Sequence, residues 1–160
     1  MSIEKITIIG AGTMGAGIAQ ICSENEFKTT LFDKFSDSLD TGFEKINNFW
    51  DKGIAKGKTT QEQKELWSSR LKVSTNFVDS VTDADLVIEA VPENINLKIE
   101  IFRELDKSTK ESCILATNTS SLSITRIANS TKNPKRVIGM HFFNPVPLMK
   151  LIEIIKHEDT

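Results

Sequence analysis

The sequence predicts an α/β fold of the Rossmann-like, doubly wound type, with a mostly parallel sheet covered by helices on both faces. Short β-branched runs alternate with helical patterns along the chain. The first run ends in a G-x-G-x-x-G turn that opens a helical pattern, and the second ends in Asp33, 21 residues after Gly12. Because 160 residues suffice for one core, we expect a single domain, residues 1–160.

The composition excludes several classes of function. Hydrophobic residues make up 39% and charged residues 26%, as in ordinary soluble domains. A formal net charge of −2 offers no basic surface for nucleic acid. Without a long apolar run or a signal peptide, we expect a cytoplasmic protein that has no membrane partner. Cys22 and Cys113 form no CxxC or Cys/His cluster, so we expect buried, reduced thiols and no metal site.

The run from Ile3 to Ile9 predicts a buried parallel strand. In the turn that follows, Gly10 permits a tight bend, Gly12 lets the backbone approach a pyrophosphate, and Gly15 allows close packing of helix on strand. The N–H groups at the start of the next helix can hold the phosphates. The expected dinucleotide-binding segment is Gly10, Ala11, Gly12, Thr13, Met14 and Gly15.

The second expected strand, Lys28–Phe32, leads directly into Asp33. A carboxylate at this place accepts hydrogen bonds from the ribose hydroxyls and repels a 2′-phosphate, so NAD is favoured over NADP. Lys34 works against this preference, because a cation there can accommodate the phosphate. A helix cap followed by a chance acidic residue is the open alternative.

The segment 36–70 has a polar, helical pattern with two glycines. Four apolar residues at helical spacing predict a helix that ends near Gly53: Leu39, Phe43, Ile46 and Trp50. A second short helix is expected around Glu62 to Leu71, and a loop after Val73. Lys52, Lys56 and Lys58 cluster at the break. These lysines either form a solvated helix end or bind the phosphorylated tail of a substrate.

The next expected strand covers residues 84–91. The carboxyl ends of strands line the ligand crevice in such sheets, so Ala90, Val91 and Glu93 are expected under the cofactor. Lys98 lies near the start of the helix that follows, expected over 96–107. The helix dipole disfavours a cation there, so Lys98 is expected to have an anionic partner.

The strand expected at 113–116 ends in five polar residues, Thr117-Asn118-Thr119-Ser120-Ser121. They cap the next helix, donate hydrogen bonds into the crevice, or do both on different residues.

The last two expected strands, 137–140 and 151–155, flank an Asn-Pro turn, and this return can bring Glu153 beside His141. A carboxylate that faces an imidazole fixes its tautomer and raises its affinity for a proton, which suits general acid–base catalysis. The alternative is a core histidine packed by Phe142 and Phe143, with Glu153 merely on the surface.

Four motifs in this order resemble the 3-hydroxyacyl-CoA dehydrogenases, with the bacterial 3-hydroxybutyryl-CoA branch the most similar: G-A-G-x-M-G, D-L-V-I-E-A-V-P-E, N-T-S-S-L and H-F-F-N-P-V-P-x-M-K-L-x-E-x-I. The resemblance covers essentially the whole chain. It implies an NAD-dependent oxidoreductase of fatty-acid and butanoate metabolism that interconverts (S)-3-hydroxyacyl-CoA, such as 3-hydroxybutyryl-CoA, and 3-oxoacyl-CoA.

The resemblance also implies roles for single residues. His141 is the base that takes the proton of the 3-hydroxyl. Glu153 orients the His141 imidazole and favours its charged form. Ser120 binds the substrate oxygen beside the nicotinamide. Asn118 and Asn144 hold the cofactor and the active-site geometry.

Glu93 and Lys98 match family positions on the ribose and nicotinamide side of the cofactor. The family's coenzyme A contacts fall here on Ile46 and Gly53 instead of a hydroxyl and a lysine. That departure leaves the lysine cluster at 52, 56 and 58 as the candidate coenzyme A site.

Chains of this family continue into an all-helical domain that closes over the substrate and forms the dimer. The resemblance therefore implies a homo-oligomer, or a separate helical domain as partner, besides the acyl-CoA substrate. By itself this chain is expected to bind NAD and to be weakly active. Two other classes stay open: a non-catalytic dinucleotide-binding module, and a structural protein, because a lens crystallin resembles the same family.

Overall fold

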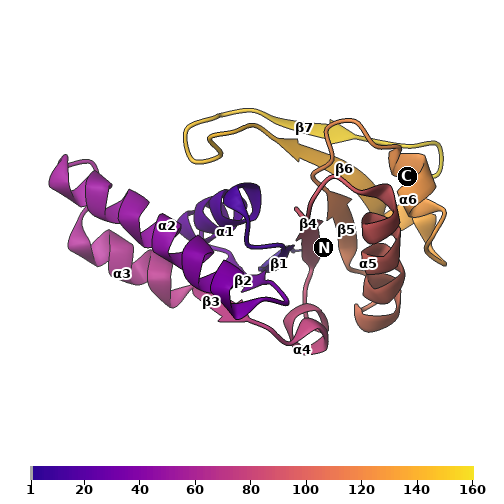
Figure 1. Ribbon diagram of the computed structural model, residues 1–160, viewed down its shortest axis with the longest axis horizontal. Helices are drawn as coiled ribbons and strands as arrows, with labels where there is room; N and C mark the ends of the chain where they lie inside the picture. The colour runs from indigo at the N-terminus through magenta and orange to yellow at the C-terminus, as the bar shows by residue number, and fades with distance from the viewer. Residues whose placement is uncertain (1) are drawn as a thin grey trace.

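The computed structural model describes residues 2–160, which form one seven-stranded sheet with helices on both faces (Figure 1). In spatial order the strands are β3 (Leu71–Ser74), β2 (Lys28–Phe32), β1 (Lys5–Ile9), β4 (Leu86–Glu89), β5 (Ile114–Thr117), β6 (Val137–Phe142) and β7 (Ile152–Ile155). Neighbours from β3 to β6 are parallel, and β7 is antiparallel to β6. The predicted Rossmann-like fold is confirmed.

Helices connect the strands and cover the sheet. They are α1 (Thr13–Glu24), α2 (Ser36–Ala55), α3 (Gln61–Ser69), α4 (Phe77–Val81), α5 (Ile95–Ser108) and α6 (Ile124–Ala128), with a short 3₁₀ turn at Pro134–Arg136. In Figure 1, α1, α2 and α3 lie beside the β1–β3 half of the sheet, and α5 and α6 lie beside β4 to β6.

Two apolar layers hold the helices to the sheet, because alternate residues of a strand point to opposite faces. In β1, Ile6 and Ile8 belong to the layer shared with α1 and α2, and Ile9 belongs to the layer shared with α5 and α6. Trp50 of α2 and Phe102 of α5 are almost fully buried in these two layers. Burial on both faces accounts for the nearly continuous apolar runs in the central strands.

The structure corrects several predicted boundaries. The apolar-striped helix ends at Ala55, two residues after Gly53 and so close to the predicted end, and the chain then turns at Gly57, whose φ of 67° lies in the left-handed region. Gly53 lies within α2, where its lack of a side chain lets Thr59 pack closely against the helix. A Cβ at this position would lie 2.7 Å from Thr59 Oγ1. Leu71 is not helical but begins β3. The short helix α4 lies where a loop was expected after Val73.

The strand expected over residues 84–91 is shorter, Leu86–Glu89, so Ala90 and Val91 lie in the loop after it. At the other end of the sheet, every residue of β7 is exposed. Within residues 2–160, each helix is too short or too polar to cross a membrane.

Candidate active site

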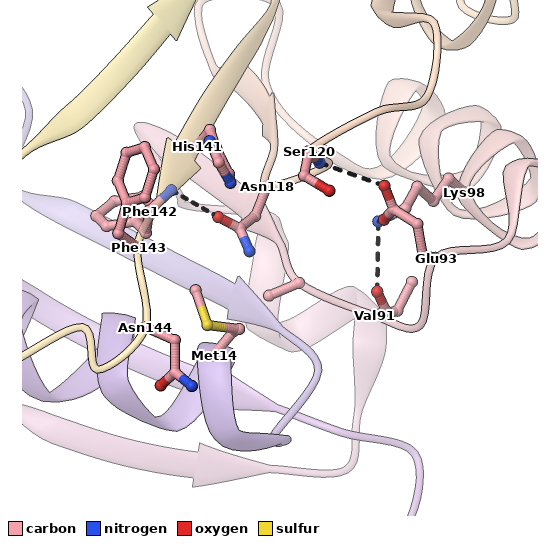
Figure 2. Close-up of a pocket in the computed structure, with 11 residues that line it drawn as sticks. Met14, Val91, Glu93, Lys98, Asn118, Ser120, His141, Phe142, Phe143 and Asn144 are labelled. Carbon is pink, nitrogen blue, oxygen red and sulfur yellow. Dashed lines mark hydrogen bonds and ion pairs between the residues drawn. The ribbon is translucent and has the colours of Figure 1, made fainter.

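A cavity of about 350 Å³ opens at the carboxyl ends of the central strands. Figure 2 shows the side chains around it. They come from the start of α1, the loop after β4, α5, the loop after β5, and the end of β6 with its turn. The lining residues are Met14, Ala90, Val91, Glu93, Lys98, Asn118, Ser120, His141, Phe142, Phe143 and Asn144. The fold thus gathers nine of the candidates that the sequence placed on separate segments.

The three glycines of the turn after β1 have different structural roles. Gly10 has φ of 103°, and a Cβ there would lie 2.9 Å from the carbonyl oxygen of Ala90. A Cβ on Gly15 would lie 1.7 Å from the carbonyl oxygen of Gly10, so only glycine lets α1 start against the turn. A Cβ on Gly12 would meet nothing within 4 Å. The surface over Gly12 is therefore open to a ligand.

The N-terminus of α1 has backbone donors free for a ligand. Gly12 is the N-cap residue and has no side chain to accept from the first N–H groups, and the first turn contains no acidic residue. Thr13 and Met14 are the first residues of this turn. Free N–H groups together with the positive end of the helix dipole favour an anion such as a pyrophosphate.

Asp33 is fixed beside this turn. Its Oδ2 accepts from the N–H of Ala11 at 2.9 Å, and its Oδ1 accepts from the N–H of Phe35 at 3.0 Å. Each carboxylate oxygen keeps a second acceptor position, which suits a pair of ribose hydroxyls. The ammonium of Lys34 lies 4.8 Å from the centroid of the Phe35 ring.

Lys98 has the anionic partner expected from its place near the start of α5. Its side chain is 1% exposed, and its Nζ lies 2.6 Å from Glu89 Oε1 and 3.4 Å from Glu93 Oε2. Nζ also donates to the carbonyl oxygen of Val91 at 3.3 Å. Glu89 was not among the site residues predicted from the sequence. The available signal was a carboxylate at the end of an otherwise apolar strand, with a lysine nine residues later.

Glu93 connects this ion pair to the loop after β5. Its Oε1 accepts from Thr119 Oγ1 and from the backbone N–H of Ser120. Partial burial raises the pKa of Glu93, but the hydrogen bond from Thr119 and the charge of Lys98 outweigh it, and the pKa lies below its ordinary value. Glu93 is therefore ionised at neutral pH.

The polar segment after β5 divides its roles between alternate residues. Thr117 and Thr119 are buried, and Thr119 Oγ1 accepts from the N–H of Leu122 at 3.0 Å. Asn118 and Ser120 line the cavity instead. Asn118 Oδ1 also accepts from the N–H of Phe142 at 2.9 Å, which ties the end of β5 to β6. The predicted cap of the next helix is not in this segment, because Ser123 caps α6, while Thr119 closes the turn before it.

His141 and Glu153 stand opposite each other in the β6–β7 register. His141 Nδ1 lies 2.9 Å from Glu153 Oε2. The two side chains are 20% and 52% exposed, and the His141 ring packs against Phe143 with centroids 4.6 Å apart. Since Glu153 occupies Nδ1, Nε2 is the nitrogen that can exchange a proton with a ligand. Asn144 follows in the turn and lines the same cavity.

The lysine cluster lies apart from the cavity. Lys52, Lys56 and Lys58 are exposed around the C-terminal end of α2, and none lines the cavity. Ile46 is 1% exposed within the core, so it cannot contact a substrate. Lys45, which was not among the predicted site residues, lies on α2 with its Nζ 3.3 Å from Thr13 Oγ1 at the start of α1.

The two cysteines are buried and free. Burial raises the pKa of the Cys22 thiol to about 12 and that of the Cys113 thiol to about 11. Both are therefore protonated and unreactive near neutral pH. In the part of the chain that the structure describes, no group of three His, Cys, Asp or Glu side chains is arranged to hold a metal ion.

Comparisons with known proteins agree on one family. Residues 5–160 match the family model described as "3-hydroxyacyl-CoA dehydrogenase, NAD binding domain". A 3-hydroxybutyryl-CoA dehydrogenase of Clostridioides difficile is 45% identical, over 98% of this chain and 55% of that protein. The mitochondrial hydroxyacyl-coenzyme A dehydrogenase of Rattus norvegicus is also 45% identical, over 96% of this chain and 51% of that protein.

Among solved structures, an (S)-3-hydroxybutyryl-CoA dehydrogenase from Ralstonia eutropha superposes with a TM-score of 0.96 at 42% identity. The match covers 99% of this chain and 56% of that chain. The present chain spans about half the length of the curated relatives it matches.

Proposed function

The chain belongs to the 3-hydroxyacyl-CoA dehydrogenase family, and from this premise we propose that it is the NAD-binding, proton-transferring half of an enzyme that interconverts (S)-3-hydroxyacyl-CoA and 3-oxoacyl-CoA. The expected substrate is 3-hydroxybutyryl-CoA. The observation that carries the proposal is the His141–Glu153 pair, 2.9 Å apart, on the cavity that also contains Ser120.

The residues of the turn after β1 fit NAD, the cofactor of the family's N-terminal domain. The open surface over Gly12 and the free N–H groups of α1 suit the pyrophosphate, and Asp33 suits the ribose hydroxyls. When bound, NAD supplies the nicotinamide carbon that accepts a hydride from the alcohol carbon or returns it.

Proton transfer is assigned to His141. In the oxidation direction its Nε2 accepts the proton of the substrate hydroxyl, while Nδ1–H donates to Glu153. The imidazolium that forms is stabilised by the carboxylate beside it, and such positioned general bases contribute about 10²- to 10⁴-fold in rate. The hydroxyl of Ser120, at the exposed edge of the cavity, is placed to donate to the substrate oxygen.

For the coenzyme A tail we favour one face of α2. Lys45, Phe49 and Lys52 follow one another at intervals of four and three, so they share that face, and Lys56, the C-cap residue, follows four residues later. All four are exposed, and the face begins at the Lys45–Thr13 contact near the turn after β1. The lysines suit the phosphates, and Phe49, 37% exposed, suits the adenine ring. Lys58 follows the Gly57 turn, off this face, and is a weaker candidate.

An exposed apolar strip supports the presence of a further domain or a second copy over the β6–β7 edge. The strip comprises Leu148, Met149, Leu151, Ile152, Ile154 and Ile155, which are 37% to 63% exposed. Several large apolar side chains exposed along one edge of a sheet are typical of an interaction site. In the proposed enzyme a helical domain closes the substrate cleft here, so the present chain binds NAD and turns over slowly by itself.

The test uses Glu153→Gln with Glu158→Gln as the matched control, because Glu158 is exposed and lies outside the cavity. NADH affinity is measured by fluorescence titration, and acetoacetyl-CoA reduction by NADH absorbance. The rate is measured for this chain and for the same chain extended by the C-terminal half of the Clostridioides difficile relative. Glu153→Gln should lower turnover about 10²-fold or more and leave NADH affinity unchanged.

Unchanged turnover and an unchanged pH profile in Glu153→Gln would remove His141 from catalysis. NADH binding without turnover in both preparations would favour a non-catalytic dinucleotide-binding module. Neither binding nor turnover would favour a structural protein.

A further inference from the structure

A fully buried carboxylate lies beneath the cavity. The family resemblance assigns no role to it. Glu89 ends β4 and is 0% exposed. Its Oε1 accepts from Lys98 Nζ at 2.6 Å and from the N–H of Val91 at 2.8 Å, and its Oε2 accepts from Thr117 Oγ1 at 2.7 Å. One side chain thus ties together α5, the loop after β4 and the end of β5.

Stability alone does not account for this arrangement. The rest of β4 is apolar, and replacing a buried ion pair by well-packed apolar residues is often neutral or stabilising. A buried carboxylate is costly unless donors to its oxygens offset the loss of hydration. Glu89 has three donors, one of them an ammonium 1% exposed. Its position therefore points to the cavity above it.

The contacts of Glu89 continue to the cavity edge. Lys98 Nζ also lies 3.4 Å from Glu93 Oε2, and Glu93 accepts from the backbone N–H of Ser120. In Figure 2 the Lys98, Glu93 and Ser120 side chains lie in a row on one side of the cavity. Polar contacts therefore connect the Lys98 ammonium, through Glu93, to the backbone of Ser120.

The charges of this group add to a net −1. Glu89 and Glu93 contribute two negative charges and Lys98 one positive charge. Since Glu89 and Lys98 are buried and lie 2.6 Å apart, they largely neutralise each other, and Glu93, 40% exposed, presents its charge to the cavity. The nicotinamide ring is positively charged in NAD⁺ and neutral in NADH. A net negative group beside it therefore favours the oxidised form.

We propose that Glu89 is a positioning residue that fixes the Lys98 ammonium beneath the cavity, and that the Glu89–Lys98–Glu93 group sets the relative affinity for NAD⁺ and NADH through its net charge. The inference rests on the proposed cofactor site and is independent of the acyl-CoA reaction. It concerns binding, so this chain can test it without any turnover.

The experiment measures NAD⁺ and NADH affinities by calorimetry for four variants. Glu89→Gln makes the group neutral and should lower the affinity ratio of NAD⁺ to NADH about 3- to 10-fold, the size expected for one charge in a partly solvated site. Lys98→Met makes the group −2 and should raise the ratio by a similar factor. The double variant returns to −1 and should restore the ratio to within about twofold. Thr117→Val removes one hydrogen bond and no charge, and should leave the ratio unchanged.

Opposite shifts in the two charge variants, cancelled in the double variant, would support the proposal, because a merely structural role would weaken both cofactor forms alike. Shifts in the same direction, or an unchanged ratio in variants that fold, would overturn it. If either single variant fails to fold, the double variant and the remaining single variant decide the outcome, because their predicted ratios still differ. Failure of the unmutated chain to bind either cofactor would refute the cofactor site itself, a separate result.

Discussion

Alanine placed at Gly12 and at Gly15 should damage the protein in two different ways, although the two glycines belong to one turn. A Cβ at position 12 meets nothing within 4 Å, and the backbone there has φ of −66°, which alanine adopts freely. A Cβ at position 15 would lie 1.7 Å from the carbonyl oxygen of Gly10. One variant should therefore lose binding, and the other should lose stability.

The magnitudes follow from these distances. For Gly15→Ala the clash is with backbone, so α1 must shift off β1, and overpacking of this kind costs about 3 kcal/mol or more. At about 2–4 °C per kcal/mol for a chain of this size, the melting temperature should fall by about 6–12 °C. For Gly12→Ala the loss of stability should stay within about 1 kcal/mol. Its methyl group stands where a pyrophosphate approaches, which should weaken NADH binding about 5- to 150-fold, equivalent to about 1–3 kcal/mol.

The assay combines thermal unfolding by circular dichroism with NADH fluorescence titration on the same preparations. Each variant is the control for the other, since both add one methyl group to the same turn. Tight NADH binding by a folded Gly12→Ala would show that the cofactor phosphates do not lie over this turn. A Gly15→Ala variant as stable as the unmutated chain would show that α1 does not start against Gly10 as described.

Three further predictions concern other residues. Asp33→Ala should narrow the preference for NADH over NADPH, and equal affinities of the unmutated chain for both would refute the role of Asp33. The hydrogen bond from Lys110 holds the pKa of Asp85 well below its ordinary value, so this carboxylate stabilises the fold above about pH 4 and less as the pH falls further. Asp85→Asn should accordingly lower the melting temperature by about 2–4 °C at pH 7, for a loss near 1 kcal/mol, and by less at pH 3. Labelling of Cys22 and Cys113 by a thiol reagent at pH 8 should be no faster than opening of the core, because burial raises both pKa values, and rapid labelling of the folded chain would contradict their burial. For the same reason stability should decline as the pH rises above about 8.5.

The features that the sequence predicted well are those encoded by neighbouring residues. The turn from Gly10 to Gly15 is specified by glycine spacing, and Asp33 by its distance along one strand–helix–strand unit. The approach of Glu153 to His141 follows from two short strands joined by an Asn-Pro turn. In each case the partners belong to one supersecondary unit, so the local pattern suffices.

The features that were missed depend on contacts between distant segments. Strand β3 is polar because it lies at the sheet edge, so it has no apolar run, and Leu71 was assigned to the preceding helix. Gly53 resembles a helix end, and only the fold shows that it makes room for Thr59. Glu89 has partners on β5 and α5, and although a carboxylate in an apolar strand stands out, the sequence of β4 does not show which distant groups donate to it.

The reversed direction of β7 makes the contact between His141 and Glu153 a local property of the chain. Parallel neighbours need a crossover of a dozen or more residues, whereas a reversal lets residues 12 positions apart stand opposite each other. Segment 137–155 therefore carries both members of the pair and the register that aligns them. A slip of one residue would bring Ile152 or Ile154 opposite His141 and turn the carboxylate to the other face of the sheet. The length of the connecting segment 143–151 thus matters to the proposed proton transfer as much as the two side chains, and an insertion or deletion that shifts the pairing there should abolish that transfer with both residues intact.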